Sequence, residues 1–467
     1  MNAGSSLLLR EFSPRGGYLD TWWGQVAFAV IATVTMSLIA VFLPDPTLVV
    51  LVPFAILGPL FAIKFPHILC FAFYTMAYLK LPEIYPALTP LNNVLSALSI
   101  LMSLALVWHG IFTKITPPYE APRMHKIQWI LLGFWLMIVF GAILSQDNSL
   151  SFPALSDFSK IIFLSLGIPL FLREFRQIKT LTRLFVIGGA MVSISLIYNY
   201  YTSDTLVEGT RAATGDGLLS NPNDAALILL VPLSFAAASL RSGSRPAETA
   251  WSLACAFIIA TAIVYTQSRG GLLGAGMVFT LVGARFMKSK VVPVACALIL
   301  GGLLYSAADI SSRESGGAQD AKGESAQERI YTWKAGINMG LHFPLNGVGI
   351  GNFTEMFPDY TPEALPHRLT AHSIWFLVLG ENGFVALTTF ICMIIMGFRT
   401  NMSSARLIGQ SPKSSEMRSF ASALIAGLGG FCVAGTFLSF CYQWPLYLLL
   451  GLTISLARIA AKSPLET

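Results

Sequence analysis

Residues 372–398 read HSIWFLVLGENGFVALTTFICMIIMGF, a long apolar stretch in which Glu381 is the single charged side chain. In hydrocarbon every backbone N–H and C=O group has to be satisfied internally, so a crossing segment needs about 20 mostly apolar residues in a helix. The stretch therefore predicts a membrane-spanning helix. Its histidine at the start and its glutamate in the middle need an explanation, because polar groups at membrane depth are costly.

The rest of the chain has the same character. Of 467 residues, 54% are hydrophobic and only 12% are charged, about half the charged fraction of a soluble domain. These values predict an all-α polytopic integral membrane protein with about 12–14 transmembrane helices. The first run is too long for the core of a signal peptide. The apolar runs lie near 21–43, 47–65, 66–79, 91–112, 127–144, 158–172, 184–201, 225–240, 249–267, 270–286, 291–307, 372–398, 419–440 and 445–459.

Basic residues set the expected orientation. If the N-terminus is cytoplasmic and the runs alternate, most of the 30 lysines and arginines fall in inside segments, as the positive-inside rule requires. We therefore expect both termini in the cytoplasm, and the net charge of +6 follows from this topology and does not indicate nucleic-acid binding. The six cysteines lie in or beside apolar runs without a CxxC or Cys/His pattern, so no metal site is predicted.

Two outward-facing segments, 202–224 and 308–370, are longer than the other connections. Loops of this length in a compact protein are usually functional or disordered. Residues 311–326 are polar and of low complexity, whereas 327–343 place apolar side chains on one helical stripe, which predicts an amphipathic helix on the bundle or at the membrane surface. We expect N-terminal transmembrane helices over 1–183, a catalytic region over 184–400 that includes the 308–370 loop, and C-terminal transmembrane helices over 401–467.

Arg269 is an informative polar residue on the outward side. It follows Ser268, a good helix N-cap, and precedes Gly270 and Gly271, which would leave backbone N–H groups open to approach. A helix N-terminus beside an arginine is suited to binding an anion, and the planar guanidinium matches phosphate in particular. The alternative is an interfacial arginine that reaches lipid headgroups. Arg211 offers the same chemistry from the 202–224 loop, although its surroundings fit a simple turn and helix cap equally well.

His372 begins a helix after the long outer loop, with Thr370 as candidate N-cap. The positive end of a helix and nearby arginines disfavour the imidazolium, so the pKa of His372 is expected to fall below its usual 6.5 or so. A neutral imidazole can accept a proton, which suits a general base; the alternative is a histidine satisfied at the membrane interface. Glu381, nine residues on, falls on the opposite helix face. It is therefore expected to bind neighbouring helices or to cap an irregularity at GENG.

Four segments together resemble the O-antigen ligase and polymerase superfamily over roughly residues 185–400. They are RAATGDGLLSNPNDAA from Arg211, SRGGLL from Ser268, RIYTWKAG from Arg329 with PLNGVGIGNF from Pro344, and AHSIWFLVLGENG from Ala371. The family's Arg-x-x-x-Leu element is matched by Arg269 to Leu273, and its His-Asn/Ser/Gln pair by His372 and Ser373, followed by Gly383. The chain departs from the pattern at Ala386, where Gly, Thr or Tyr is usual.

The resemblance implies a glycosyltransferase of the bacterial inner membrane whose active site faces the periplasm. Such enzymes take a glycan from undecaprenyl diphosphate and attach it to a sugar hydroxyl with inversion, without a metal or other cofactor. It implies His372 as the base and Arg211 and Arg269 as the clamp on the diphosphate, with Gly270, Gly271, Arg329 and Ser373 in support. The acceptor is lipid A–core in an O-antigen ligase of lipopolysaccharide biosynthesis, the reading we favour, and a second lipid-linked glycan in a polysaccharide polymerase. A lipid-glycan flippase or other transporter is the rival from another class, but no internal repeat is visible.

Overall fold

The computed structural model describes residues 65–80, 84, 91–111, 124–202, 206, 207, 209–214, 217–240, 245–284, 326–362, 368–408 and 414–462. The chain divides into two compact units, Met1–Pro66 and His67–Thr467, and nearly all described residues belong to the second. The expected runs at 21–43, 47–65 and 291–307 and the low-complexity stretch 311–326 lie almost wholly outside the described residues.

The described part of the chain is helical, and it contains no β-strand beyond one isolated bridge between Val207 and Arg211. Among the described residues, seven helices are long and apolar enough to cross a membrane. They are α6 (Lys126–Ile143), α7 (Asn148–Phe171), α8 (Phe175–Thr202), α10 (Pro246–Tyr265), α15 (Ile374–Leu407), α16 (Ser415–Gly435) and α17 (Trp444–Lys462).

Four further expected runs form apolar helices or helix portions below the length of a full span. The helices that contain them are α3 (Pro66–Leu79), α5 (Leu91–Ile111), α9 (Pro222–Ala238) and α11 (Arg269–Gly283). Within the described residues, each apolar run recognised in the sequence therefore corresponds to a helix, which confirms the all-helical membrane fold.

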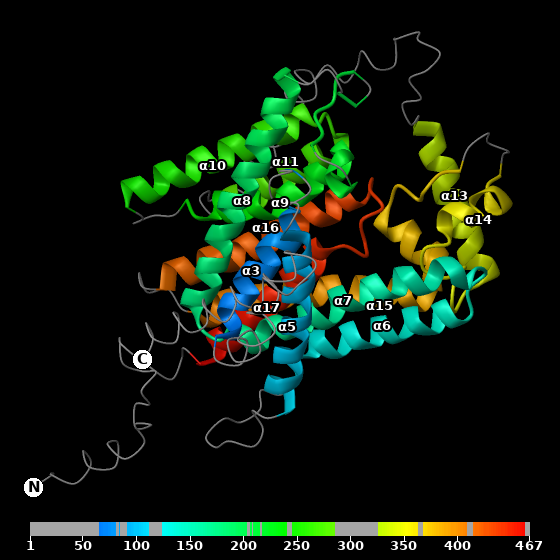
Figure 1. Cartoon of the computed structure of the whole chain (residues 1–467), viewed down its shortest axis with the longest axis horizontal. Coiled ribbons are helices and arrows are strands. Elements are labelled where there is room, and N and C mark those ends of the chain that lie inside the picture. The colour runs from blue at the N-terminus through cyan, green and yellow to red at the C-terminus, as the bar shows by residue number, and fades with distance from the viewer. Residues whose placement is uncertain are drawn as a thin grey trace, which may run out of the picture. The chain divides into compact units, whose positions relative to one another are not determined.

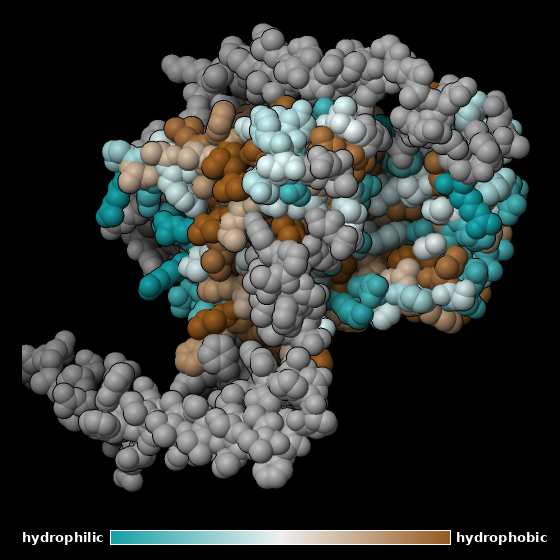
Figure 2. Space-filling view, turned by 45° about the horizontal axis from the view of Figure 1, so that its top comes forward, coloured by the Kyte–Doolittle hydropathy of each residue, from teal (hydrophilic) through white to brown (hydrophobic). Residues whose placement is uncertain are grey.

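Hydrophobic side chains on the outside of these helices agree with a lipid environment. Phe257 of α10, Trp129 of α6 and Ile100 of α5 are 74%, 62% and 62% exposed. A water-soluble helix would place polar residues at such positions. On the face shown in Figure 2, teal side chains gather toward the left and right edges, and a band of brown side chains lies just inside the left edge.

The α9 helix forms the centre of one half of the bundle. Nearly every residue from Ala225 to Ala238 is buried, because α9 packs against α8, α10, α11 and α16 at once. The C-terminal helix α17 is similarly enclosed, between α7 and α15. Helices that are hydrophobic on all sides are expected in such central positions.

The helix predicted over 327–343 is confirmed as α13, Ala326–His342. It packs along α15 (Figure 1), where Gly336 and Gly340 lie against Phe376 and Leu379. Of the apolar stripe recognised in the sequence, Trp333 stacks on Phe376 of α15. The other members, Ile330, Ile337 and Leu341, are exposed. The exposed part of the stripe is thus available to a membrane surface, whereas Trp333 and two glycines contact the bundle.

Candidate functional site

Arg211 is held between two helix ends. The turn Val207–Arg211 closes through reciprocal backbone hydrogen bonds of 3.1 and 3.0 Å, and Arg211 is only 6% exposed. Its Nε donates to the carbonyl oxygen of Thr266 at 3.1 Å, and its Nη2 donates to Oδ1 of Asn223 at 2.6 Å. The loop arginine is therefore bound to the end of α10 and the start of α9, which separates it from an ordinary exposed turn residue.

Arg269 begins α11 directly after that same helix end. Ser268 is its N-cap as expected, with Oγ accepting a hydrogen bond of 3.2 Å from the N–H of Gly271. Gln267 takes a positive φ of 49°, which L-residues adopt at some energetic cost. The short break between α10 and α11 thus carries both Thr266, a hydrogen-bond partner of Arg211, and Arg269 three residues later.

The glycines after Arg269 have a different role from the one expected. A Cβ on Gly271 would lie 2.5 Å from Cβ of Ala226 in α9, and one on Gly270 would lie 3.3 Å from the carbonyl oxygen of Ala434 in α16. These glycines allow α11 to approach its neighbours closely. The N–H of Gly271 is used by the Ser268 cap, so the expectation of two open N–H groups is wrong for Gly271.

His372 stands at a strained point of the backbone, just before α15. Its φ is 46°, a left-handed conformation that a residue with a Cβ rarely adopts. Burial lowers the pKa of His372 to about 4, and the positive charge of Arg329 contributes to the shift. The imidazole is therefore neutral at pH 7 and can accept a proton, as the sequence predicted.

The start of α13 lies beside the histidine. Thr332 Oγ1 donates to the carbonyl oxygen of Ala371 at 3.1 Å, and the Arg329 guanidinium carbon lies 6.0 Å from the centre of the Phe437 ring. A cation at this distance is attracted by the face of an aromatic ring. Arg329, which the sequence offered only as support, is thereby fixed next to His372.

Ser373 is the N-cap of α15 by position, but its side chain makes no capping hydrogen bond. Its hydroxyl is fully buried and has no hydrogen-bond partner among the described residues. Thr370 does not cap the helix either, contrary to expectation; its hydroxyl donates to Oγ of Ser439 at 3.0 Å. The turn before α15 is therefore held by contacts to other segments and not by its own cap.

Sequence reasoning missed the segment 434–439, at the end of α16. It contacts both the arginine region at the start of α11 and the region around His372, because Phe437 lies next to Gly270 of α11 and to Arg329 of α13. Trp375 Nε1 also donates to Oγ1 of Thr436 at 3.1 Å. No charged or catalytic residue type marks this segment in the sequence, and only its position reveals that it joins the two arginine segments and the histidine.

Glu381 explains the irregularity at GENG. Its Oε1 accepts hydrogen bonds from the N–H groups of Gly351 and Phe353, at 3.0 and 3.2 Å, at the start of α14 (Phe353–Tyr360). Gly383 kinks α15 with a φ of 79°. The GVGIG turn fills the break, with Val348 N–H donating to the carbonyl oxygen of Gly380 at 2.9 Å.

The helix that Glu381 holds also contacts the segment before His372. The α14 helix carries Glu355, which forms an ion pair with Arg368, four residues before His372. Glu381 thus binds a neighbouring helix and stabilises an irregular turn, as expected. Its hydrogen bonds are to Gly351 and Phe353 and not to the histidine. Among the described residues, no group of three His, Cys, Asp or Glu side chains could hold a metal ion.

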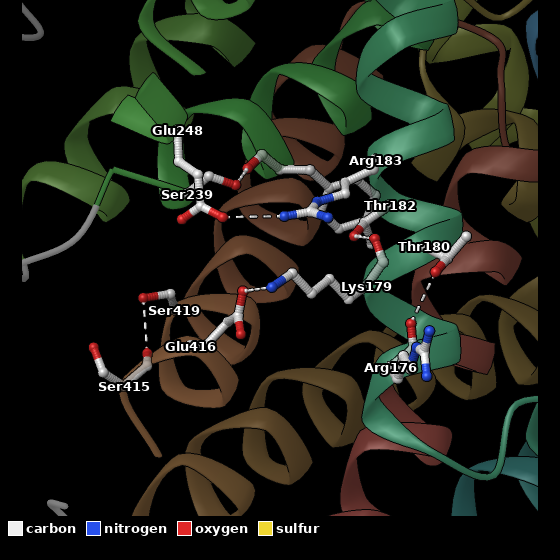
Figure 3. Close-up of polar contacts among 11 residues, drawn as sticks. Arg176, Lys179, Thr180, Thr182, Arg183, Ser239, Glu248, Ser415, Glu416 and Ser419 are labelled. Atoms are coloured by element: carbon white, nitrogen blue, oxygen red, sulfur yellow. Dashed lines mark hydrogen bonds and ion pairs between the residues drawn. The ribbon is translucent and has the colours of Figure 1, made fainter. Parts of the chain in front are cut away.

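A separate cavity lies where α8, α9, α10 and α16 meet, at helix ends other than those of the candidate site (Figure 3). Lys179 Nζ and Oε1 of Glu416 are 2.5 Å apart, and Arg183 Nη2 and Oε1 of Glu248 are 3.3 Å apart. These pairs join α8 to α16 and α10. Because each charge is met by its opposite within the protein, the cavity has no surplus charge for binding a diphosphate.

Comparison with known families identifies part of the chain. Residues 254–391, which include Arg269, Arg329 and His372, match the sequence profile of O-antigen ligase. They form a domain of the O-antigen ligase family. This family consists of membrane glycosyltransferases that use lipid-linked glycans, so the chain is a multi-pass membrane glycan transferase of the ligase or polymerase type. No curated protein matches the chain. Arg211 and the 434–439 segment of this glycan transferase lie outside the matched region, although the structure joins them to it.

Proposed function

We propose that the chain is an O-antigen ligase. It transfers an O-antigen-type glycan from undecaprenyl diphosphate to a sugar hydroxyl of lipid A–core. The oxygen of that hydroxyl attacks the anomeric carbon of the donor sugar, and the bond from this carbon to the diphosphate oxygen breaks. The electron pair of that bond leaves on the diphosphate, the hydroxyl proton passes to His372, and the anomeric configuration inverts.

Arg211 and Arg269 act on the leaving group. A diphosphate leaves readily when its developing charge is stabilised by positioned cations, and two arginines supply this without a general acid. The hydrogen bonds from Arg211 to Thr266 and Asn223 hold its guanidinium in advance of binding. A preorganised cation stabilises the transition state without the cost of reorganising during the reaction.

The observation that carries the proposal is the neutral, buried His372 at the edge of the arginine-containing region. The low pKa that burial and Arg329 impose on His372 keeps the imidazole ready to accept a proton. Once a diphosphate binds nearby, its negative charges raise the pKa of His372. His372 is then a stronger base in the complex than in the free enzyme. This suits catalysis, because a general base is most efficient when its pKa lies near the operating pH.

We further propose that the site faces the periplasm of the bacterial inner membrane, with both termini cytoplasmic. This rests on the distribution of basic residues. Reporter fusions after residues 120, 178 and 408 should report cytoplasm, and those after 210 and 320 should report periplasm. A cytoplasmic signal at 320 would put the candidate site on the wrong side of the membrane.

A deletion strain separates the ligase from a polymerase. Loss of long-chain lipopolysaccharide with accumulation of polymeric glycan on undecaprenyl diphosphate is the result expected for a ligase. Accumulation of single lipid-linked repeat units would instead identify a polymerase, whose acceptor is a second lipid-linked glycan. Gel banding of the lipopolysaccharide and analysis of the lipid-linked pool give both readouts from the same cells.

A further inference from the structure

Three tyrosines meet at the ends of α8 and α10. The rings of Tyr200 and Tyr265 are stacked, with centroids 4.3 Å apart and planes 15° apart, and Tyr201 meets Tyr265 edge to face at 5.6 Å. The hydroxyls of Tyr201 and Tyr265 are 2.5 Å apart. We call Tyr200, Tyr201 and Tyr265 the tyrosine cluster.

The cluster presents an open aromatic surface. Tyr201 is 69% exposed even though its hydroxyl is hydrogen-bonded and its ring is braced by two others. A rigid, exposed aromatic ring with a polar tip is a favourable contact for an amphipathic ligand, because few rotamers have to be frozen on binding.

The cluster adjoins the proposed diphosphate clamp through the backbone. Ala212, next to Arg211, donates its N–H to the carbonyl oxygen of Tyr265 at 2.9 Å. Asn199 of α8 donates to the carbonyl oxygen of Ala213 at 3.1 Å. The loop that carries Arg211 is therefore attached to both helices of the cluster.

We propose that Tyr201 is a sugar-binding residue, packing its ring against the sugar that is bonded directly to the diphosphate of the donor. This inference rests on the proposed function. The first sugar is bonded directly to the diphosphate, so a diphosphate held at Arg211 keeps this sugar close to the clamp. The sugar can then contact the neighbouring tyrosine cluster. The C–H groups on one face of a pyranose ring are apolar and slightly positive, which complements the negative face of an aromatic ring.

Tyrosines also gather at membrane interfaces, where they contact lipid headgroups. A lipid contact and a sugar contact can be distinguished by their effects on ligand binding. A lipid-facing tyrosine stabilises the protein in the membrane regardless of the substrate, whereas a sugar-binding tyrosine discriminates between undecaprenyl diphosphate with and without a sugar. Binding of the two ligands to the same variant therefore separates them.

The test uses the purified full chain in nanodiscs with two probes, bare undecaprenyl diphosphate and undecaprenyl diphosphate carrying one N-acetylglucosamine. Tyr201→Leu should weaken binding of the sugar-bearing probe by about 3- to 10-fold and leave the bare probe within about twofold. Tyr201→Phe, which keeps the ring, should bind both probes like the wild type. Trp129→Leu, at an exposed aromatic residue of α6, is the control and should affect neither.

Equal binding of both probes by Tyr201→Leu and wild type, or equal weakening of both, would overturn the assignment of Tyr201 to the sugar. Failure of the wild-type protein to bind even bare undecaprenyl diphosphate would contradict the diphosphate clamp itself, and the sugar contact with it. A selective loss confined to the sugar-bearing probe supports both the clamp and the sugar contact.

Discussion

Arg211 donates a hydrogen bond from Nε to the carbonyl oxygen of Thr266, at 3.1 Å, across 55 residues of sequence. Thr266 belongs to the break between α10 and α11, and the next helix begins at Arg269. An arginine from the 202–224 loop is thus combined with one at a helix start. The family match begins only at residue 254, so Arg211 of the proposed clamp lies outside it.

The two arginines should both be needed for transfer. Arg269→Lys keeps the positive charge but loses the planar fork that binds phosphate through two parallel hydrogen bonds. We expect it and Arg211→Ala to lower glycan transfer by about 10²–10³-fold at normal expression, measured with purified protein and lipid-linked donor. Arg406→Lys, on the distant end of α15, is the matched control. If both variants transferred glycan at the wild-type rate, the proposal that these arginines bind the diphosphate would be wrong.

Gly271 should tolerate no side chain, for reasons of packing. An added Cβ would come within 2.5 Å of Ala226 Cβ, whereas at Gly270 the nearest atom would be 3.3 Å away. Overpacking of this kind costs about 1–3 kcal/mol. Gly271→Ala should therefore lower the thermal midpoint in detergent clearly more than Gly270→Ala does. Equal midpoints with selective loss of donor binding would instead favour a role for the N–H groups.

Glu381 should act through the hydrogen bonds that it accepts. Glu381→Ala leaves the N–H groups of Gly351 and Phe353 without their acceptor, at a cost of about 1–3 kcal/mol for each unsatisfied group. We expect a lower thermal midpoint together with reduced transfer, because α14 and the Glu355–Arg368 ion pair lose their anchor. Glu381→Gln keeps an oxygen acceptor and should be much milder. If Gln were as damaging as Ala, the negative charge and not the hydrogen bonding would be essential.

The pH dependence of the enzyme should report the surroundings of His372. Protonation removes the base, so activity falls as pH drops through the pKa of His372. In the free enzyme burial and Arg329 lower this pKa to about 4, and kcat/KM, which reports the free enzyme, should remain level from pH 7 down to about 5. In kcat, which reports the complex, the acid fall should begin at higher pH because bound diphosphate favours the imidazolium.

The Arg329→Met variant tests whether His372 is the group that titrates in the pH profile of kcat/KM. Removing the neighbouring positive charge should raise the pKa of His372, since Arg329 is one cause of its depression. The acid limb of kcat/KM should therefore move to higher pH. An unchanged limb in the variant would mean that the titrating group is not His372.

Much of the architecture follows from the sequence because membrane spans depend on local hydrophobicity. The start of α13 and the Ser268 cap were also predicted, since helical periodicity and capping are local properties. The shared location of Arg211 and the 266–269 break could not be derived, because their contact joins distant segments. The same is true of Phe437, which bridges Gly270 and Arg329 without any distinctive neighbours in sequence.

One local pattern was misleading, and another left two alternatives open. The glycine pair after Arg269 is typical of an anion-binding helix start, yet the same residues serve close helix packing, and sequence does not distinguish these uses. The apolar stripe of α13 left open whether that helix lies on the bundle or at the membrane surface. In the structure Trp333 stacks on Phe376 of α15, and Gly336 and Gly340 allow the close approach. In membrane proteins small residues commonly form the contacts between helices.

The central claim is that His372 removes the proton from the acceptor hydroxyl. Its most direct test is single-turnover transfer by His372→Ala with saturating lipid-linked donor and lipid A–core acceptor. The account predicts donor affinity within a few-fold of wild type, because the arginines hold the diphosphate, together with a transfer rate lower by about 10²–10⁴-fold. Near-normal transfer by His372→Ala would contradict the account and leave the histidine as an interfacial residue.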